Sequence, residues 1–419
     1  MSLRCCRAEG FPRFHRHGDG DDLYPLLEME YIVAAMSGAT AKRTEGTEMM
    51  EFSVKKFDLQ EELELTQGVV ERKTTIPILS NLLFEAENGK VRLTATDLEL
   101  SICTACEAKV KKEGSGTIPA KKLLELVRLL PDEEIRFKLL DNHWVQIQSG
   151  RKNYKMVGMS KENFPAIPES PHALAKIPAR LLAGLITRTA FAISVEESRY
   201  TLNGGLLILK PEMIVMVATD GHRMALAEAD HKFAGLNSEA RVLVPKKALS
   251  EIQRLAADAG EEATIEFSRD DSYLFFQVGS RRLVSRILTG QFPNFEAVLP
   301  RENNKAIILE RNELNDAIRR VSQLADQRSR AVKFSVSNEG IEISAQSPEY
   351  GEASETIEKS YKGDPISIGF NAQYMLDFLA AAPDGPVRLE LKDEQSAGQM
   401  RPEGDTAYRY KYVIMPMRI

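Results

Sequence analysis

The stretch TIPAKKLLELVRLL, from Thr117 to Leu130, is matched by LVPKKALSEIQRLA, from Leu243 to Ala256, and more faintly by IGFNAQYMLDFLAA, from Ile368 to Ala381. Equivalent residues of the three copies are 126 and 125 positions apart: Pro119, Pro245 and Phe370. Solenoid repeats usually span about 20–50 residues, whereas a period of this size is that of a whole domain. The chain is therefore predicted to consist of three copies of one domain.

Further landmarks keep nearly the same period. The tripeptide ATD at Ala95–Asp97 recurs 123 residues later at Ala218–Asp220, and NFPAIP from Asn163 is echoed by QFPNFEAVLP from Gln291. The polar, turn-rich stretches PESPHAL and LPRENNK separate the copies near residues 174 and 300. The predicted domains are residues 50–174, 175–300 and 301–419.

Composition sets limits on the function. The chain has 419 residues, of which 43% are hydrophobic and 28% charged, as in an ordinary soluble protein with several cores. It contains no apolar run of about 18 residues that could span a membrane. Four cysteines without a regular pattern favour a reducing cytoplasm. A net charge of −6 excludes coating of nucleic acid through overall basicity, so any such role needs a local surface.

Residues 1–49 differ from the rest of the chain. They show no sustained periodicity, and their longest apolar run, Tyr31 to Met36, is too short for a signal peptide. Their possible metal ligands match no zinc spacing: Cys5, Cys6, His15 and His17. We predict a disordered extension, or a translation start assigned upstream of Met49 or Met50.

Each repeat is predicted to open with a strand and an amphipathic helix, followed by alternating strands and a second helix. Apolar residues at helical spacing define the opening helices: Leu59, Leu63 and Val70; Leu181, Leu185 and Ile186; Leu314, Ile318, Val321 and Leu324. In the first two repeats the second helix is predicted to begin after Pro119 and after Pro245. The pattern indicates an α+β class with six helices. The polar face of these helices carries basic residues, which could equally be ordinary solvent-exposed positions.

Cys103 and Cys106 form a CxxC motif, which could indicate a redox or zinc site. The motif lies in LELSICTACEAKV, which is predicted to be a strand, so the two sulfurs should point to opposite faces. A zinc site would need two further ligands at suitable spacing, and none is evident. We therefore expect structural thiols.

The segment TDGHR, from Thr219 to Arg223, contains residue types that hydrolases use, and Ser194 or Ser198 could act as a nucleophile. However, the chain has no GxSxG elbow, HExxH motif or Walker loop. Because Asp-Gly is a common turn pair, Asp220 and Gly221 more simply form a turn between two strands.

The C-terminus is apolar to its last residue, whereas chain ends are usually polar and frayed. Pro416 should end the strand pairing of the preceding segment. Met415, Met417 and Ile419 are then either covered by another part of the protein or line a groove for a partner. Methionine suits the second role because it is flexible and polarizable.

Five segments occur in a specific order along residues 50–419: TATDLE (Thr94–Glu99), ATDGHRMA (Ala218–Ala225), GQFPNFEAVLP (Gly290–Pro300), GFNAQYMLDFL (Gly369–Leu379) and YVIMPMRI (Tyr412–Ile419). In this combination the chain resembles the bacterial sliding clamps, the β subunits of DNA polymerase III. The first 49 residues have no counterpart in that family.

The resemblance implies an α+β fold of three similar DNA-clamp domains per chain. Helices would line the inside and antiparallel sheets the outside of a ring closed by a head-to-tail homodimer. Such a ring is a non-catalytic processivity factor that holds duplex DNA by topology, independent of sequence and without a cofactor. Its implied partners are the replicative polymerase, the clamp loader and repair polymerases, which bind through short peptide motifs.

The resemblance also implies three sets of residues. The partner-peptide pocket would comprise Leu202, Thr219, Gly221, His222, Arg223, Met224, Pro293, Val298, Asn371, Tyr374, Met415, Pro416, Met417 and Arg418. The DNA-facing residues would include Lys73, Arg199, Tyr200, Lys246 and Lys247. The dimer interface would include Tyr154, Met156 and Leu324, where pairing across the subunit boundary would protect an edge strand.

Two alternative functions differ from this one in class. A repeat-built adaptor could bind proteins through the same pocket without encircling DNA. A hydrolase could use Asp220 and His222, although the chain lacks the motifs of such an enzyme.

Overall fold

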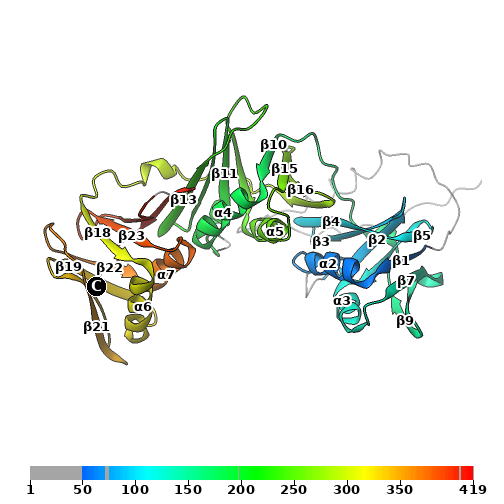
Figure 1. Cartoon of the computed structure of the whole chain (residues 1–419), viewed down its shortest axis with the longest axis horizontal. Coiled ribbons are helices and arrows are strands. Elements are labelled where there is room, and N and C mark those ends of the chain that lie inside the picture. The colour runs from blue at the N-terminus through cyan, green and yellow to red at the C-terminus, as the bar shows by residue number, and fades with distance from the viewer. Residues whose placement is uncertain (1–49, 71–74, 197, 405–406, 419) are drawn as a thin grey trace, which may run out of the picture. The chain divides into compact units, whose positions relative to one another are not determined.

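The computed structural model describes residues 50–70, 75–196, 198–404 and 407–418. The predicted extension, residues 1–49, therefore lies outside the described residues. The rest of the chain forms three α+β domains, each with two helices packed against antiparallel sheets (Figure 1). The predicted fold class and the six helices are confirmed in this part of the chain.

The described part of domain 1 contains two α-helices and nine strands. Its elements are β1 (Glu51–Lys55), α2 (Lys56–Thr66), η1 (Pro77–Ser80), β2 (Asn81–Glu87), β3 (Lys90–Thr96), β4 (Leu100–Glu107), β5 (Lys109–Lys112), β6 (Gly114–Pro119), α3 (Ala120–Leu129), β7 (Glu134–Leu139), η2 (Asp141–His143), β8 (Trp144–Ser149), β9 (Lys152–Val157) and η3 (Lys161–Asn163). The two helices pack against each other, and α2 also lies against β3 and β4.

Domain 2 repeats this plan. Its elements are β10 (Ala175–Pro178), α4 (Ala179–Thr189), η4 (Ala190–Ala192), η5 (Tyr200–Leu202), β11 (Gly204–Lys210), β12 (Met213–Thr219), β13 (Arg223–Asp230), β14 (Ala240–Pro245), α5 (Lys246–Ala257), β15 (Thr264–Arg269), β16 (Tyr273–Val278), β17 (Arg281–Arg286) and η6 (Phe295–Ala297). Helices α4 and α5 pack together, as α2 and α3 do.

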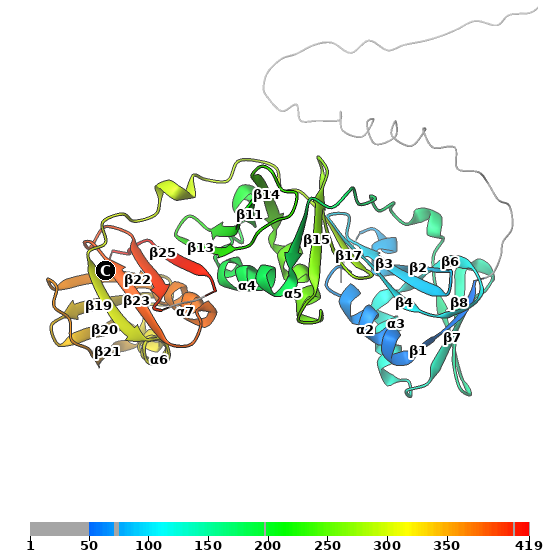
Figure 2. The ribbon, with the colours of Figure 1, turned by 45° about the horizontal axis from the view of Figure 1, so that its top comes forward.

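Domain 3 follows the same order. Its elements are β18 (Lys305–Glu310), α6 (Arg311–Val321), η7 (Ser322–Leu324), β19 (Ala331–Ser337), β20 (Gly340–Ser347), β21 (Gly351–Glu358), β22 (Ile366–Asn371), α7 (Ala372–Ala381), β23 (Pro386–Leu391), β24 (Gly398–Pro402) and β25 (Arg409–Ile414). In every domain a strand leads directly into each helix, which explains the repeated spacing in the sequence (Figure 2).

Two sheets of eight strands run across the domain boundaries. One has the order β10-β15-β16-β17-β4-β3-β2-β6, so β17 of domain 2 pairs with β4 of domain 1. The other has the order β14-β11-β12-β13-β25-β24-β23-β18, so β13 of domain 2 pairs with β25 of domain 3. A five-stranded sheet in domain 1 ends at β9, and a four-stranded sheet in domain 3 ends at β21.

The prolines lie just before the helices rather than inside them. Pro119, Pro178 and Pro245 occupy the N-cap positions of α3, α4 and α5. Proline fits here because its ring holds an extended backbone just where the strand ends, and no helical hydrogen bond is lost. The prediction that a helix begins after Pro119 and after Pro245 is confirmed, since α3 starts at Ala120 and α5 at Lys246.

The apolar stripes are confirmed for most positions and wrong for three. Val70 lies beyond the end of α2, while Leu181 is only half-buried because its neighbour Leu182 faces the core. Leu324 lies in the short helix η7 and is partly exposed. Helical periodicity alone does not show where a helix ends, and this accounts for the positions outside the helices.

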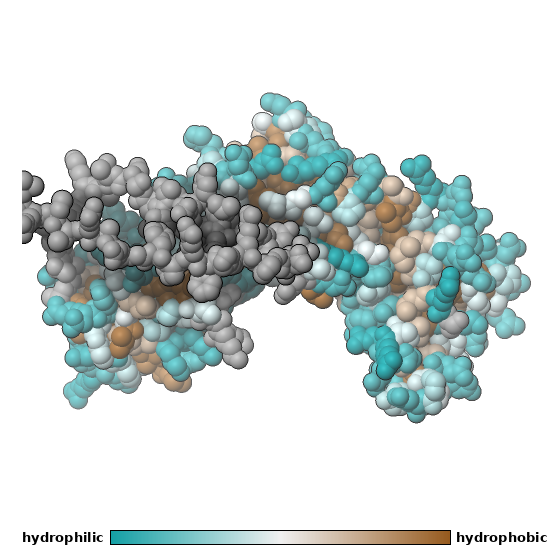
Figure 3. Space-filling view, turned by 180° about the vertical axis from the view of Figure 1, so that it is seen from behind, coloured by the Kyte–Doolittle hydropathy of each residue, from teal (hydrophilic) through white to brown (hydrophobic). Residues whose placement is uncertain are grey.

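The CxxC residues are free thiols on strand β4, as expected. Burial raises the pKa of Cys106 to about 12, so it is not a reactive thiolate. In the space-filling view the surface is mainly hydrophilic, with apolar residues in separate patches (Figure 3). Among the described residues, no helix is long and apolar enough to cross a membrane.

Candidate partner-binding site

The TDGHR segment forms a tight turn between β12 and β13. One oxygen of the Asp220 carboxylate accepts hydrogen bonds from the backbone N–H groups of His222 and Arg223, at 2.9 and 3.0 Å. Gly221 has a φ of +88°, a conformation that glycine adopts without steric cost. Asp220 is therefore a turn residue, as its pairing with glycine predicted.

The equivalent turn in domain 1 has the same hydrogen bonds. Asp97 accepts from the backbone N–H groups of Glu99 and Leu100, and Leu98 takes the place of Gly221 with a φ of +79°. A non-glycine residue in this region of backbone space is unusual and strained. The matching turns support the repeat that the ATD spacing predicted.

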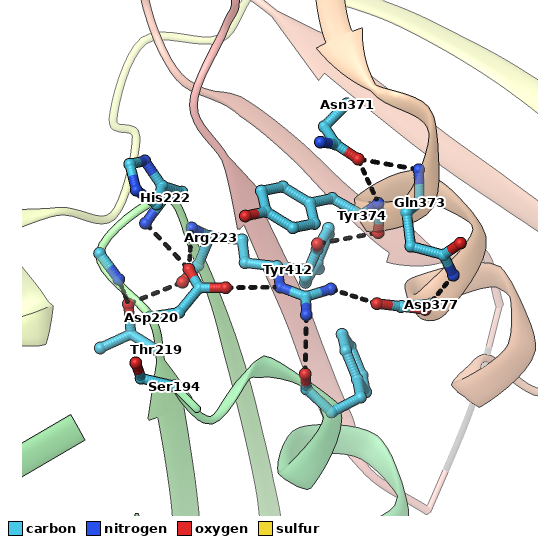
Figure 4. A network of polar contacts seen from close by, with 12 residues as sticks. Ser194, Thr219, Asp220, His222, Arg223, Asn371, Gln373, Tyr374, Asp377 and Tyr412 are labelled. Atoms are coloured by element: carbon cyan, nitrogen blue, oxygen red, sulfur yellow. Dashed lines mark hydrogen bonds and ion pairs between the residues drawn. The ribbon is translucent and has the colours of Figure 1, made fainter. Parts of the chain in front are cut away.

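Arg223 connects this turn to domain 3 (Figure 4). Its guanidinium forms ion pairs with Asp220 at 3.0 Å and with Asp377 of α7 at 2.5 Å, and it donates to the Phe191 carbonyl at 2.8 Å. The Tyr374 ring lies 4.3 Å from the guanidinium carbon. Because only 9% of its side chain is exposed, Arg223 is a buried, fully paired cation that joins two domains.

Helix α7 is held in place at its first turn and beneath Tyr374. The Asn371 side chain caps the helix by accepting from the backbone N–H groups of Gln373 and Tyr374. The Tyr412 hydroxyl donates to the Tyr374 carbonyl at 2.9 Å. Burial raises the pKa of Tyr412 far above its ordinary value, so this hydroxyl remains a donor.

The C-terminal segment lies between the two domains. The Met415 N–H donates to the His222 carbonyl at 2.9 Å, and the Met417 N–H donates to the Gly369 carbonyl at 2.8 Å. Strand β25 ends at Ile414, immediately before these contacts. The segment therefore touches the TDGHR turn on one side and β22 on the other.

Apolar side chains remain exposed beside this segment. Met415 is 45% exposed and Val298 is 47% exposed. Near them in the chain, Phe295 and Val413 belong with Met224 to one buried cluster, so the 292–299 loop and the end of β25 share a core. We refer to the exposed or half-exposed residues of this region as the tail surface: His222, Val298, Met415, Pro416 and Met417.

Two further loops meet the same region. The Arg199 guanidinium donates to the Asp220 carbonyl at 2.9 Å, and the Thr201 side chain lies directly beside Gly290. Leu202 follows in η5 and is almost fully buried. The structure thus ties the 199–202 loop to the TDGHR turn and to the loop that carries Pro293.

The described members of the predicted pocket divide into two groups. In the first group, the residues of the TDGHR turn, of helix α7 and of the C-terminal segment contact one another through the hydrogen bonds and ring contacts given above. Arg418 is exposed and lines a cavity over β19, β20 and β21 instead. Ile419 lies outside the described residues.

Sequence reasoning missed three residues on which the site depends: Phe191, Asp377 and Tyr412. Each meets Arg223 or Tyr374 from a distant part of the chain. The only sequence signal was that Asp377 lies three residues after Tyr374, so both lie on one face of a helix.

The predicted DNA-facing residues differ in their surroundings. Lys247 forms an ion pair with Asp97 of domain 1, and Arg199 pairs with Glu196 at 2.9 Å. Tyr200 is 63% exposed, and Lys246 is half-buried at the first position of α5. Lys73 lies outside the described residues.

Most cations on the helix surfaces have carboxylate partners. Pairs within this set are Lys122–Glu125, Arg128–Glu64, Arg180–Glu261, Arg254–Glu251, Arg311–Asp384 and Arg320–Glu355. Among the described α-helix residues, five cations form no ion pair: Lys56, Lys121, Arg188, Lys246 and Arg319. The helix surfaces are thus largely charge-neutralised.

The predicted interface residues lie at the ends of the two smaller sheets. Tyr154 and Met156 are half-buried on the edge strand β9, and Leu324 lies in η7 beside the edge strand β21. Both strands have one side without a partner strand in the described part of the chain.

The site lacks the features of a hydrolase. The Asp220 carboxylate is held by backbone N–H groups and by Arg223, and His222 is exposed. No three His, Cys, Asp or Glu side chains within the described ranges are arranged to hold a metal ion.

Comparison with known proteins agrees with the geometry. Three family models match: the N-terminal domain of the DNA polymerase III beta subunit at residues 50–168, the central domain at 176–294 and the C-terminal domain at 296–418. The beta sliding clamp of Pseudomonas putida is 32% identical over 374 residues, covering 88% of this chain and all of the relative. That of Caulobacter vibrioides is 34% identical over 379 residues, with the same coverage.

Solved structures show the same likeness. The DNA polymerase III subunit beta from Pseudomonas aeruginosa matches with a TM-score of 0.83 at 32% identity, covering 88% of this chain and all of that one. The family expected from five short segments is confirmed, and the hydrolase alternative is wrong. The chain belongs to the DNA polymerase III beta subunit family, the beta sliding clamps, and is a non-catalytic processivity factor of that polymerase.

Proposed function

We propose that two copies of this chain close head to tail into a ring around duplex DNA and hold polymerases through the tail surface. The observation that carries the ring is that one edge of each smaller sheet, β9 in domain 1 and β21 in domain 3, has no partner strand among the described residues. An exposed strand edge readily pairs with another chain. Because the two edges lie in different domains, their pairing is heterologous and generates a closed ring when the rotations sum to a full turn.

Charge complementarity supports this pairing. Strand β9 carries Lys152 and Lys155, whereas β21 carries Glu352, Glu355 and Glu358. Opposite charges directly across two strands stabilise a sheet, and like charges destabilise it. A second β9 or a second β21 would therefore be a poorer partner than the opposite edge.

Sedimentation velocity at micromolar concentration tests the dimer. Leu324→Asp should shift the chain toward monomer because it places a carboxylate at the interface. Leu129→Ser, which changes an apolar residue that is 85% exposed in domain 1, is the matched control and should remain dimeric. A wild-type chain that sediments only as monomer contradicts the ring.

DNA would be held by topology rather than by strong ion pairs. The carboxylates that neutralise most helix cations support this view, since a groove binder that depends on phosphate contacts loses affinity steeply as salt rises. The test is loading onto nicked circular DNA, followed by linearisation. A clamp stays on the circle at high salt and leaves once it is cut, whereas a protein-binding adaptor shows no such dependence.

The tail surface would bind short, partly apolar peptides of the polymerase and its accessory proteins. Exposed Val298 and Met415, close in the chain to a shared apolar cluster, support this role, because a few buried anchors supply most of the affinity in such interfaces. Deleting Met415 to Ile419 removes several apolar side chains, each contributing about 1.5–3 kcal/mol when fully buried. A micromolar interaction totals only about 8 kcal/mol, so the deletion should abolish it.

Fluorescence anisotropy with a labelled polymerase peptide measures this loss, and sedimentation of the same variant is its control. Unchanged peptide affinity would show that residues 415–419 are not part of the binding site. Loss of the dimer would instead assign the tail a structural role.

A further inference from the structure

Strand β17 carries two consecutive arginines whose surroundings differ. Successive side chains of a strand point to opposite faces of the sheet, so Arg281 and Arg282 cannot share an environment. Arg281 faces helix α2, where its guanidinium pairs with Glu61 at 2.5 Å and with Glu62 at 2.7 Å. Its charge is therefore fully compensated.

Arg282 has no such compensation. Its Nε is buried without a hydrogen-bond partner, and its Nη2 lies 3.9 Å from the Sγ of Cys103. Among the described residues, no carboxylate forms an ion pair with it. A thiol sulfur is a weak acceptor, so the guanidinium lacks the strong acceptor that a partly buried cation requires.

A cavity of about 420 Å³ lies in front of Arg282. It spans the boundary between the first two domains: Cys103 comes from β4, Gln277 and Arg282 come from β16 and β17, and Ser170 comes from the connecting segment. Ser280 also lines it. Their hydroxyl and amide groups already hydrogen-bond within the protein: Gln277 donates to the Gly279 carbonyl, Ser280 donates to the Ala105 carbonyl, and Ser170 bonds with Ser268. The Arg282 guanidinium is therefore the principal group of the lining that can hold an oxygen-rich anion.

The other charged groups of the lining limit the charge of that anion. Arg92 already pairs with Glu85 at 3.4 Å and with Glu87 at 3.3 Å. Glu169 is an exposed carboxylate on the lining and would repel a multiply charged ligand. A single negative charge matches the single uncompensated cation.

We propose that this cavity binds a small, singly charged oxyanion, either a carboxylate or a singly charged phosphate group, with Arg282 as its principal ligand. The bound anion accepts from the terminal N–H groups of the Arg282 guanidinium, since the buried Nε is out of its reach, and contacts residues of both domains. It therefore stabilises the boundary between domains 1 and 2, because a ligand that binds only the folded arrangement favours that arrangement. The site is separate from the tail surface and independent of its function.

Cys103 provides a direct readout, since its Sγ lies beside Arg282. The experiment measures alkylation of Cys103 by peptide mass mapping in the full chain, with chloride replaced stepwise by acetate at constant ionic strength. A parallel series uses phosphate near pH 6, where it is mostly singly charged. Site occupancy slows alkylation by a factor of 1 + [L]/Kd, about fivefold when the anion is at four times its Kd. Cys106, which is buried in the core, is the control for general unfolding and should stay unmodified.

Three variants separate the proposal from a general salt effect. Arg282→Gln should abolish the protection, and Arg282→Lys should reduce it, because lysine keeps the charge but lacks the planar set of N–H donors of the guanidinium. Arg286→Gln is the matched control on the same strand, where Arg286 has its own partner in Glu99 at 3.8 Å, and it should keep full protection.

Acetate protection alone identifies a carboxylate ligand, and protection in the phosphate series alone identifies a phosphate group. Equal protection in wild type and Arg282→Gln, or no protection by either anion, overturns the proposal. A rise in melting temperature with the protective anion, absent from Arg282→Gln, verifies the same binding without using the thiol.

Discussion

The boundary between domains 1 and 2 and the boundary between domains 2 and 3 are both crossed by a continuous sheet, but different side chains stabilise them. At the first boundary, the acidic helix α2 faces arginines of domain 2. Glu62 accepts from Arg281 and from the Thr104 hydroxyl, and the Arg254 guanidinium donates to the Glu64 carbonyl at 2.9 Å. Carboxylate–guanidinium pairs dominate this contact.

At the second boundary, one guanidinium lies among aromatic rings. Arg223 contacts Tyr374 and Phe191 through cation–π interactions, and the Phe191 and Tyr412 rings lie 5.7 Å apart. Within the described part of this boundary, the strongly buried ion pairs are those of Arg223. The free energy gained by burying aromatic rings does not depend on ionic strength, whereas the attraction within partly exposed ion pairs is screened by salt.

This comparison shows that the side chains, and not the backbone arrangement, determine how each boundary is stabilised. The same backbone arrangement can be stabilised by charges or by rings, so the boundaries should respond differently to salt, pH and substitution. Arg281–Glu62 is as buried as Arg223–Asp220, so only the more exposed pairs of the first boundary, such as Lys247–Asp97, should weaken as salt rises. Four substitutions test this contrast.

The largest effect is expected from Arg223→Met at the second boundary. It leaves Asp220 and Asp377 without their cation, and breaking a buried pair typically costs about 3–5 kcal/mol. Urea unfolding followed by circular dichroism measures the loss, which should be the same at low and high salt. Arg409→Met is the control, because Arg409 is 48% exposed and should cost no more than about 1 kcal/mol.

Glu62→Ala should have the second largest effect, at the first boundary. Glu62 is buried, and its loss leaves Thr104 without its acceptor and Arg281 with only Glu61. We expect a loss of about 2–3 kcal/mol, comparable to leaving buried polar groups unpaired. The single tryptophan, Trp144, lies in domain 1 and reports this unfolding by fluorescence. Glu64→Ala, a more exposed carboxylate on the same helix, should cost much less.

Lys247→Ala removes an ion pair that joins α5 to the Asp97 turn. Because the lysine side chain is 44% exposed, we expect a loss of only about 0.5–1 kcal/mol. The loss should vanish at high ionic strength. A loss that persists in about 1 M salt would show that this contact depends on packing rather than on charge.

The smallest effect concerns pH. Burial raises the pKa of Glu251 above its ordinary value of 4.5, and Arg254 only partly opposes this. A raised carboxyl pKa contributes stability that is fully present below 4.5 and is lost as pH rises through the folded value. Glu251→Gln should therefore gain stability relative to wild type between pH 4 and pH 7. A constant difference across that range would mean that Glu251 titrates normally.

Much of the fold was predictable from the sequence because it depends on local patterns. The repeat of about 125 residues, the amphipathic helices and the Asp-Gly turn all follow from residue spacing and backbone preference. The α+β class and the family could therefore be recognised without coordinates. The helix ends, by contrast, were misplaced around Val70 and Leu324, because periodicity does not include the contacts that terminate a helix.

The cross-domain partners could not be predicted, because nothing in local sequence indicates which distant residue an edge strand or a cation will meet. Arg281 and Arg282 are identical neighbours in the sequence, yet one lies between two carboxylates and the other faces a cavity. Only the pairing of β17 with β4 decides which face of the sheet each arginine occupies and which residues surround it. The sequence by itself determined three similar domains; tertiary pairing decided how each charge is compensated, since compensation depends on distances of a few ångströms between residues far apart in the chain.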